Sequence, residues 1–131
     1  MAGLSLVTSA LIQNWVYDLH MRATTPALIE DPVLKSFGAG IRVLYGDNLE
    51  RVVLYGSRAR GDARQDSDYD VAVFLKTLVS RWQEGIRIAK VQLAVLDTTG
   101  QTVNAMPFPA GSWTDPTSPL MHEIREDGLD I

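Results

Sequence analysis

The sequence predicts an α/β domain, because segments of helical and of strand character alternate along its 131 residues. Apolar side chains that recur three and four positions apart predict helices, and short runs of β-branched and aromatic residues predict strands. Helices are expected over 4–22, 32–45, 78–96 and 119–127, and strands over 52–55, 68–75 and 101–106.

The first expected helix lies in an N-terminal extension, residues 1–30. This extension is part of a single domain that spans 1–131. Core packing is the favoured role of its apolar stripe. Docking to a partner is the alternative, because Trp15 and Tyr17 suit an interface. The stripe consists of Leu4, Val7, Leu11, Trp15 and Leu19.

The later helices have recognisable ends. Asp31 is expected to cap the second helix, with Pro32 at its first position and Gly46 beyond its end. Its buried residues should be Leu34, Phe37, Ile41 and Leu44. Thr77 is expected to cap the third helix, whose buried stripe should be Leu78, Trp82, Ile86, Ala89, Leu93 and Leu96.

The C-terminal third is expected to hold a strand, a proline-containing loop and a final helix. Prolines at 107 and 109 should end the third strand. Trp113, in the loop that follows, is either a lid over a pocket or a plug for the core. A final helix should end at Gly128, after which Leu129 and Ile131 fold back onto the body.

Composition excludes several classes of protein. The chain has 46% hydrophobic and 21% charged residues, as a globular domain does, and no segment that could span a membrane. A net charge of −4 argues against broad nucleic-acid binding. The absence of cysteine excludes disulfides and thiolate chemistry and suits a reducing cytoplasm, which is the expected location.

The segment from Val52 to Leu75 carries the chemistry. A short apolar strand ends at Gly56 and Ser57, where a turn or helix start leaves backbone N–H groups free for an anion. Ten residues later, Asp68 and Asp70 project from one face of an extended chain, and two such carboxylates favour a bound divalent cation. A phosphate-binding turn near a carboxylate pair suits metal-dependent nucleotide chemistry.

Two other motifs are incomplete. Residues 56–61 begin like a P-loop, but Asp62 stands where that motif needs lysine. Ser57 is not a nucleophile elbow, because Ala59 replaces its second glycine.

With these residues the chain resembles the minimal nucleotidyltransferases of the polymerase-beta superfamily. The resemblance rests on Gly56-Ser57, ten intervening residues, and Asp68-Tyr69-Asp70. It weakens over 100–106 and returns over 119–128, which is similar to the closing helix of that family.

The resemblance implies a small mixed β-sheet palm with helices packed on one face. It also implies that Gly56 and Ser57 hold the phosphates of a nucleoside triphosphate, that Asp68 and Asp70 bind Mg²⁺, and that AMP passes from ATP to an acceptor hydroxyl. Arg58 and Arg60 could add positive charge at the triphosphate, or could be solvent-exposed loop residues.

One position departs from the family pattern. The third carboxylate of the family corresponds to Asn104, which can offer a carbonyl oxygen to a metal but cannot accept a proton. Asp66 or a substrate group could replace it, or the protein could bind nucleotide without turning it over.

Two functions follow from the resemblance. The first is transfer of AMP to a partner, with a HEPN-domain toxin as the expected partner and an antitoxin role for this chain. The second is a catalytically inactive antitoxin or scaffold that acts by binding. The sequence leaves the oligomeric state open, homo-oligomers included.

Overall fold

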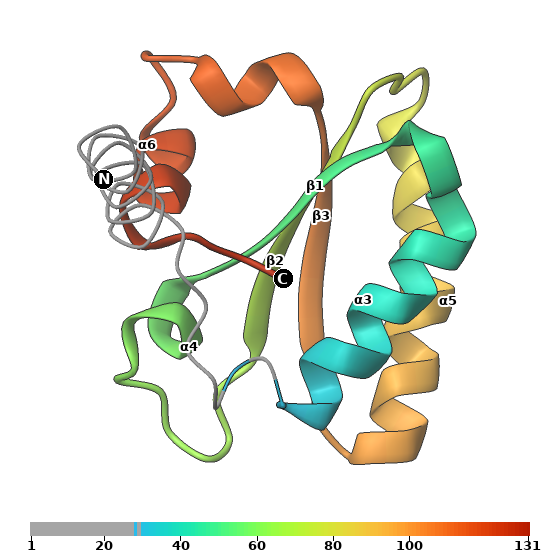
Figure 1. Cartoon of the computed structure of the whole chain (residues 1–131), viewed down its shortest axis with the longest axis vertical. Helices are drawn as coiled ribbons and strands as arrows, with labels where there is room; N and C mark the ends of the chain where they lie inside the picture. The colour runs from blue at the N-terminus through green and yellow to red at the C-terminus, as the bar shows by residue number, and fades with distance from the viewer. Residues whose placement is uncertain (1–27, 29) are drawn as a thin grey trace, which may run out of the picture.

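The computed structural model describes Leu28 and residues 30–131, so the predicted helix over 4–22 lies outside the described residues. The described chain forms one four-stranded mixed sheet with helices against it (Figure 1). Its elements are α3 (Pro32–Tyr45), η1 (Gly46–Asn48), β1 (Leu49–Tyr55), α4 (Gly56–Arg60), β2 (Tyr69–Leu75), α5 (Arg81–Thr99), β3 (Val103–Pro109), η2 (Ala110–Thr114), α6 (Pro119–Asp127) and β4 (Leu129–Asp130).

The strand order is β3-β2-β1-β4. β1 pairs antiparallel with β2 and β4, whereas β2 pairs in parallel with β3. The α/β class with a mixed sheet is therefore confirmed.

Helices cover both faces of the sheet, and this differs from the expected arrangement. α3 and α5 pack on one face, as predicted, around Phe37, Ile41 and Ile88. α6 packs on the other face, where Met121 and Ile124 contact Phe74 and its neighbours. Alternate residues of β2 point to the two faces, so both faces are apolar and both need cover.

α3 begins and ends as predicted. Asp31 Oδ1 accepts hydrogen bonds from the backbone N–H groups of Val33 (2.8 Å) and Leu34 (3.3 Å), which caps the helix. Its other oxygen, Oδ2, accepts a bond from the Tyr69 hydroxyl at 2.8 Å. One carboxylate therefore ties the start of α3 to the start of β2.

α5 differs from the prediction in both start and orientation. Ser80, not Thr77, caps it, because the Ser80 hydroxyl accepts a bond from the backbone N–H of Gln83. The buried side chains are Glu84, Ile88 and Val95, and the expected stripe is largely exposed. This helix carries apolar residues on two faces, so spacing alone could not identify the one that packs.

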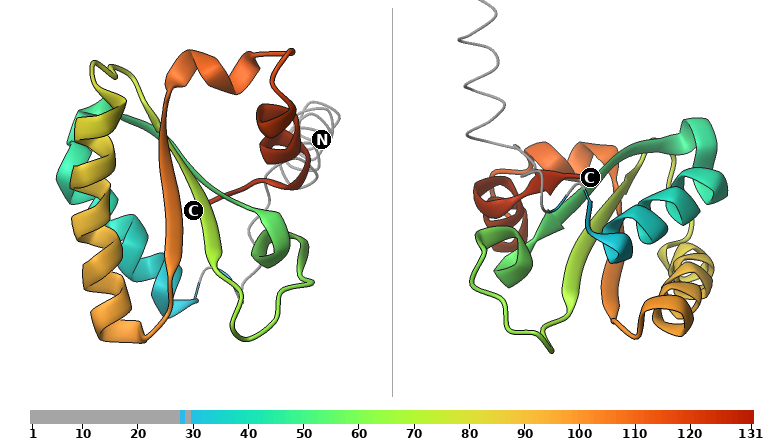
Figure 2. Two further views of the ribbon diagram at one scale, coloured as in Figure 1. Left: turned by 180° about the vertical axis from the view of Figure 1, so that it is seen from behind. Right: turned by 60° about the horizontal axis from the view of Figure 1, so that its bottom comes forward.

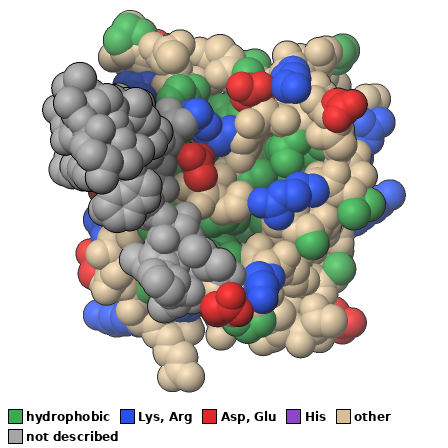
Figure 3. Space-filling model, viewed as in Figure 1, with side chains coloured by type: hydrophobic (Ala, Val, Ile, Leu, Met, Phe, Trp, Pro, Cys, Tyr) green, Lys and Arg blue, Asp and Glu red, His purple; other side chains and the backbone are tan. Residues whose placement is uncertain are grey.

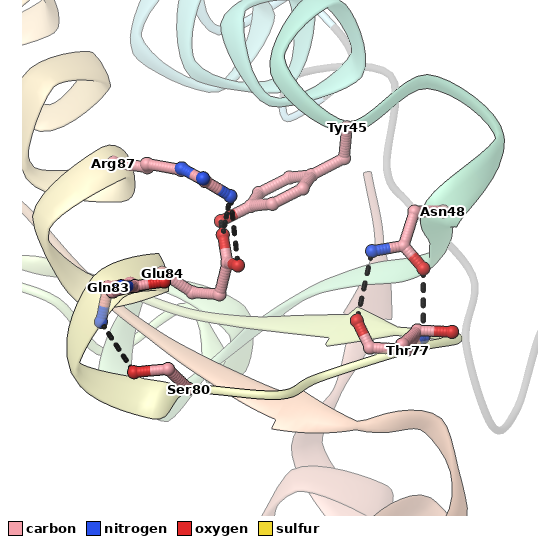
Figure 4. A network of polar contacts seen from close by, with 7 residues as sticks. All are labelled: Tyr45, Asn48, Thr77, Ser80, Gln83, Glu84 and Arg87. Atoms are coloured by element: carbon pink, nitrogen blue, oxygen red, sulfur yellow. Dashed lines mark hydrogen bonds and ion pairs between the residues drawn. The ribbon is translucent and has the colours of Figure 1, made fainter.

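A polar network fixes the orientation of α5. The Glu84 carboxylate is buried and accepts hydrogen bonds from the Tyr45 hydroxyl (3.0 Å) and from Arg87 Nη1 (3.1 Å), as Figure 4 shows. Nearby, Asn48 bonds both backbone groups of Thr77, which holds the turn between β2 and α5. A buried carboxylate needs such partners, and one of them, Tyr45, belongs to α3, so this bond links the two helices.

β3 continues past the point where the sequence predicts its end. Pro107 pairs with Val73, and Pro109 pairs with Leu75, at the last positions of the strand. β3 is an edge strand, so a missing N–H leaves no ladder bond broken on its open side.

Trp113 packs on the core as a plug, with its ring edge-on to Phe74 at a centroid distance of 5.5 Å. α6 begins after the Ser118 cap and ends before Gly128, as predicted. The residues that follow do fold back, and Leu129 and Asp130 form the short strand β4 against β1.

Candidate active site

Asp70 lies at the centre of the candidate site because of the sheet register. It pairs with Tyr55 of β1 on one side and with Asn104 of β3 on the other. The positions after it on β2 alternate, so Asp70 shares a sheet face with Phe74 and α6. The register thus places Asn104, the position at which the resemblance leads one to expect a third carboxylate, beside Asp70.

Gly56 lies so close to Asp70 that a side chain at this position would displace the Asp70 carboxylate. It follows β1 with a φ of +71°, and a Cβ at this position would lie 2.6 Å from Asp70 Oδ2. A residue with a side chain would therefore strain the backbone, because of the positive φ, and would clash with the Asp70 carboxylate. The Gly-Ser turn and the Asp-x-Asp pair, ten residues apart in sequence, are adjacent in space.

The Asp70 carboxylate is costly to ionise where it lies. Burial raises its pKa above the usual 3.8, and the negative charges of Asp68 and Glu123 raise it further. The hydrogen bond from Asn104 Nδ2 to Asp70 Oδ1, at 3.4 Å, and the charge of Arg60 act in the opposite direction. A cation bound here would relieve the repulsion.

Asp68 lies just before β2 and is exposed. It lines an open polar pocket of about 610 Å³ together with Gln65, Asp66, Gly100, Gln101 and Thr102. Asp66, the alternative proton acceptor, therefore shares a pocket with a carboxylate of the Asp-x-Asp pair.

Arg58 holds the loop that leads to Asp68. Its guanidinium donates hydrogen bonds to the backbone carbonyls of Ser67 (2.8 Å) and Gln65 (3.1 Å) and stacks over the Tyr69 ring at 4.3 Å. The structure thus gives Arg58 a positioning role for the loop, and its binding of nucleotide remains a prediction.

Arg60 connects α4 with α6. Its guanidinium lies 3.0 Å from Asp127 Oδ2, 3.3 Å from Asp62 Oδ2 and 4.0 Å from Glu123 Oε1. These three carboxylates hold Arg60 without a nucleotide, and its contact with phosphate likewise remains a prediction.

Glu123 is a site residue that the sequence reasoning missed. Its charge, together with burial and Asp70, raises the pKa of the Tyr55 phenol. The available signal was its position four residues before Asp127, which places both carboxylates on one side of α6.

The site fits a metal shared with a nucleotide better than a metal held by protein alone. Among the described residues, no three His, Asp or Glu side chains are grouped so as to hold an ion. Mg²⁺ commonly binds one or two carboxylates and completes its shell with substrate phosphates and water. Asp68 and Asp70 could supply these two carboxylates, and Asn104 could add an amide oxygen.

The face in Figure 3 has basic and acidic side chains interspersed over it and no continuous basic patch. In the described part of the chain, every helix is too short or too polar to cross a membrane.

Comparison with known proteins finds a related family. Residues 41–104, which are just under half of the chain, match the family described as "Polymerase beta, Nucleotidyltransferase". Over this segment the chain is similar to polymerase beta nucleotidyltransferases, as the Gly-Ser and Asp-x-Asp pattern predicted.

One curated relative is MJ0141 of Methanocaldococcus jannaschii, a candidate protein adenylyltransferase. It is 39% identical over 59 residues, which are 44% of this chain and 60% of the relative. The match thus spans less than two thirds of the relative's length.

One solved structure shares the fold, and a second is less similar. A mutant of the toxin-antitoxin MntA-HpeT has a TM-score of 0.50 at 14% identity, with 72% of this chain and 70% of that chain covered. A toxin-antitoxin solved with AMP-PNP has a TM-score of 0.47 at 19% identity, with 70% and 69% covered.

Proposed function

We propose that this protein is a Mg²⁺-dependent nucleotidyltransferase that transfers AMP from ATP to a hydroxyl group of a partner protein. One observation carries the proposal: the Gly56 backbone and the Asp70 carboxylate lie against each other, so a phosphate at the glycine turn would lie beside Asp70 of the carboxylate pair. The relative MJ0141, a candidate protein adenylyltransferase, supports ATP and a protein acceptor as the substrates.

In the proposed reaction the acceptor oxygen forms a bond to the α-phosphorus of ATP, and the bond to the β-phosphate oxygen breaks, so pyrophosphate leaves. Bound Mg²⁺ would neutralise phosphate charge and orient the triphosphate. Asp68 and Asp70 would hold that ion, while Gly56 and Ser57 would receive the β- and γ-phosphates. Such reactions depend mainly on position and charge.

The hydroxyl group that attacks the α-phosphorus must transfer its proton to a base. Asn104 cannot take it, because an amide has no basic site at neutral pH. Asp66 is the proposed acceptor, since it lines the same pocket as Asp68. The expected partner is a HEPN-domain toxin, and neutralising it by AMP transfer would make this chain an antitoxin.

Labelled ATP tests the transfer. The protein, Mg²⁺ and the HEPN-domain protein encoded next to it, if its gene has such a neighbour, are incubated with ATP labelled on the α- or the γ-phosphate. Only the α-label should pass to the partner, and Asp68→Ala plus Asp70→Ala should abolish transfer. Absence of transfer by folded wild-type protein, or equal transfer by the double variant, contradicts the proposal.

A second function is favoured by Asn104, which faces Asp70 where the family has a carboxylate. The protein would then neutralise its partner by binding alone. In that case the double variant still binds and neutralises the toxin. Loss of neutralisation with binding intact excludes this second function.

A further inference from the structure

The outward face of α5 carries large apolar side chains that no other described element covers. Figure 2 (left) shows α5 at the outside of the molecule, with the sheet and α3 behind it. Exposed fractions are 78% for Trp82, 47% for Ile86, 64% for Leu93 and 41% for Leu96. Contiguous exposure of this kind usually marks an interaction surface.

These residues follow the spacing of a helix-pairing surface. Successive positions differ by four, three, four and three residues, which is the heptad pattern of helices that pack side by side. We call this set the seam. It consists of Trp82, Ile86, Ala89, Leu93 and Leu96.

A hollow in the seam has the shape that receives a side chain from another helix. It measures about 470 Å³ and is lined by Arg81, Trp82, Gly85, Ile86 and Ala89. Positions 82, 85, 86 and 89 are related as i, i+3, i+4 and i+7, the four residues that form a hole for a single knob in helix pairs.

Gly85 keeps the hollow open. It lies in the interior of α5, where glycine is less stable than alanine, and a Cβ there would meet nothing within 4 Å. No packing requirement within the described chain accounts for this glycine. An incoming side chain would account for it.

The charged residues beside the seam indicate which kind of helix would bind to it. Arg81 lines the hollow and exposed Lys90 directly follows the central seam residue Ala89, while Asp97 follows Leu96 at the far end of the seam. Two antiparallel copies of α5 that overlap along the whole seam, centred on Ala89, would place their Lys90 residues near each other, which opposes self-pairing in that register. A different helix with carboxylates beside its apolar face would pair with these cations.

We propose that the seam is a docking surface for an amphipathic α-helix of another protein, whose apolar face is flanked by Asp or Glu and inserts a leucine-sized side chain into the hollow at Gly85. This surface does not include the Asp68–Asp70 pair. The proposal therefore holds whether or not the chain transfers nucleotides.

Two synthetic three-heptad peptides test the proposal. Both carry leucine at the pairing positions, and one has Glu and the other Lys at the flanking positions. Fluorescence anisotropy with the full chain should give about tenfold tighter binding of the Glu peptide. Lys90→Glu should remove or reverse this preference.

Variants of α5 locate the binding surface. Leu93→Asp should weaken binding of the Glu peptide about tenfold, whereas Ala94→Asp, an exposed control on the same helix outside the seam, should change it less than about twofold. Gly85→Leu should fill the hollow and weaken binding without lowering Tm.

Three results would overturn the proposal. The first is that the two peptides bind equally well or that neither binds. The second is that Leu93→Asp binds the Glu peptide as tightly as the wild type does. The third is that the wild type is a dimer and Leu93→Asp dissociates it. The last result, measured by light scattering, would assign the seam to a second copy of this chain.

Discussion

Gly56 and Asp70 are in such close contact that a Cβ on Gly56 would lie 2.6 Å from Asp70 Oδ2. Gly56→Ala should therefore cost about 1–2 kcal/mol for its positive φ and a further amount for displacing the carboxylate. Denaturant unfolding measures the loss of stability, and a Mg²⁺–ATP titration measures the loss of binding.

Gly61→Ala is the matched control. Gly61 also has a positive φ, +82°, but a Cβ there would meet nothing within 4 Å. This variant should lose only the backbone term, about 1–2 kcal/mol, and should keep nucleotide binding. If the two variants changed nucleotide binding equally, the Gly56–Asp70 contact would have no role in nucleotide binding.

Asp70 should destabilise the metal-free protein at neutral pH. Its pKa is raised in the folded state, so the folded protein holds a proton at Asp70 more readily than the unfolded chain does. Asp70→Asn should thus raise Tm at pH 7, and the difference should shrink as the pH falls toward 3.8.

With Mg²⁺ and nucleotide present, the wild type should have a higher Tm than Asp70→Asn, because only the wild type is stabilised by the bound cation. Thermal melts from pH 3.5 to 8 provide the measurement, with Asp47→Asn on η1 as an exposed control. A Tm difference that grows as the pH falls would refute this account of Asp70.

Asn104→Asp should restore the carboxylate that the resemblance to the family leads one to expect. In metal-free protein it replaces a hydrogen bond to Asp70 with charge repulsion, so Tm should fall. With Mg²⁺ the added charge should tighten nucleotide binding and raise AMP transfer. A Tm that falls equally with and without Mg²⁺ would indicate that residue 104 lies outside the metal site.

Tyr45→Phe should loosen the attachment of α3 to α5. The variant removes one hydrogen bond to the buried Glu84 carboxylate, which should cost about 2 kcal/mol in urea unfolding. Glu84→Gln is the companion variant, because it keeps an acceptor for Tyr45 and removes the charge that pairs with Arg87. Stability unchanged by Tyr45→Phe would mean that Arg87 alone satisfies Glu84.

The candidate site could be selected from the sequence, and its function stays a prediction. Gly56, Ser57, Asp68 and Asp70 could be selected because a Gly-Ser turn and an Asp-x-Asp pair occur together at this spacing, whereas each motif alone is weak evidence. Asn104 could be selected only through the resemblance, and the β2–β3 register then places it beside Asp70.

Other features depend on tertiary contacts that no local pattern records. α5 is apolar on two faces, and the bond of its buried Glu84 to Tyr45 of α3 favours the observed orientation. The length of β3 depends on its place at the sheet edge, where Pro107 and Pro109 are tolerated. Glu123 enters the site only because α6 packs beside α4.

Calorimetric titration of ATP into the full chain, with and without Mg²⁺, tests the carboxylate–glycine site most directly. We predict saturable binding that needs Mg²⁺ and disappears in the folded double variant Asp68→Asn plus Asp70→Asn. Binding of the same strength without Mg²⁺, or in that double variant, would contradict a metal–nucleotide site at this position.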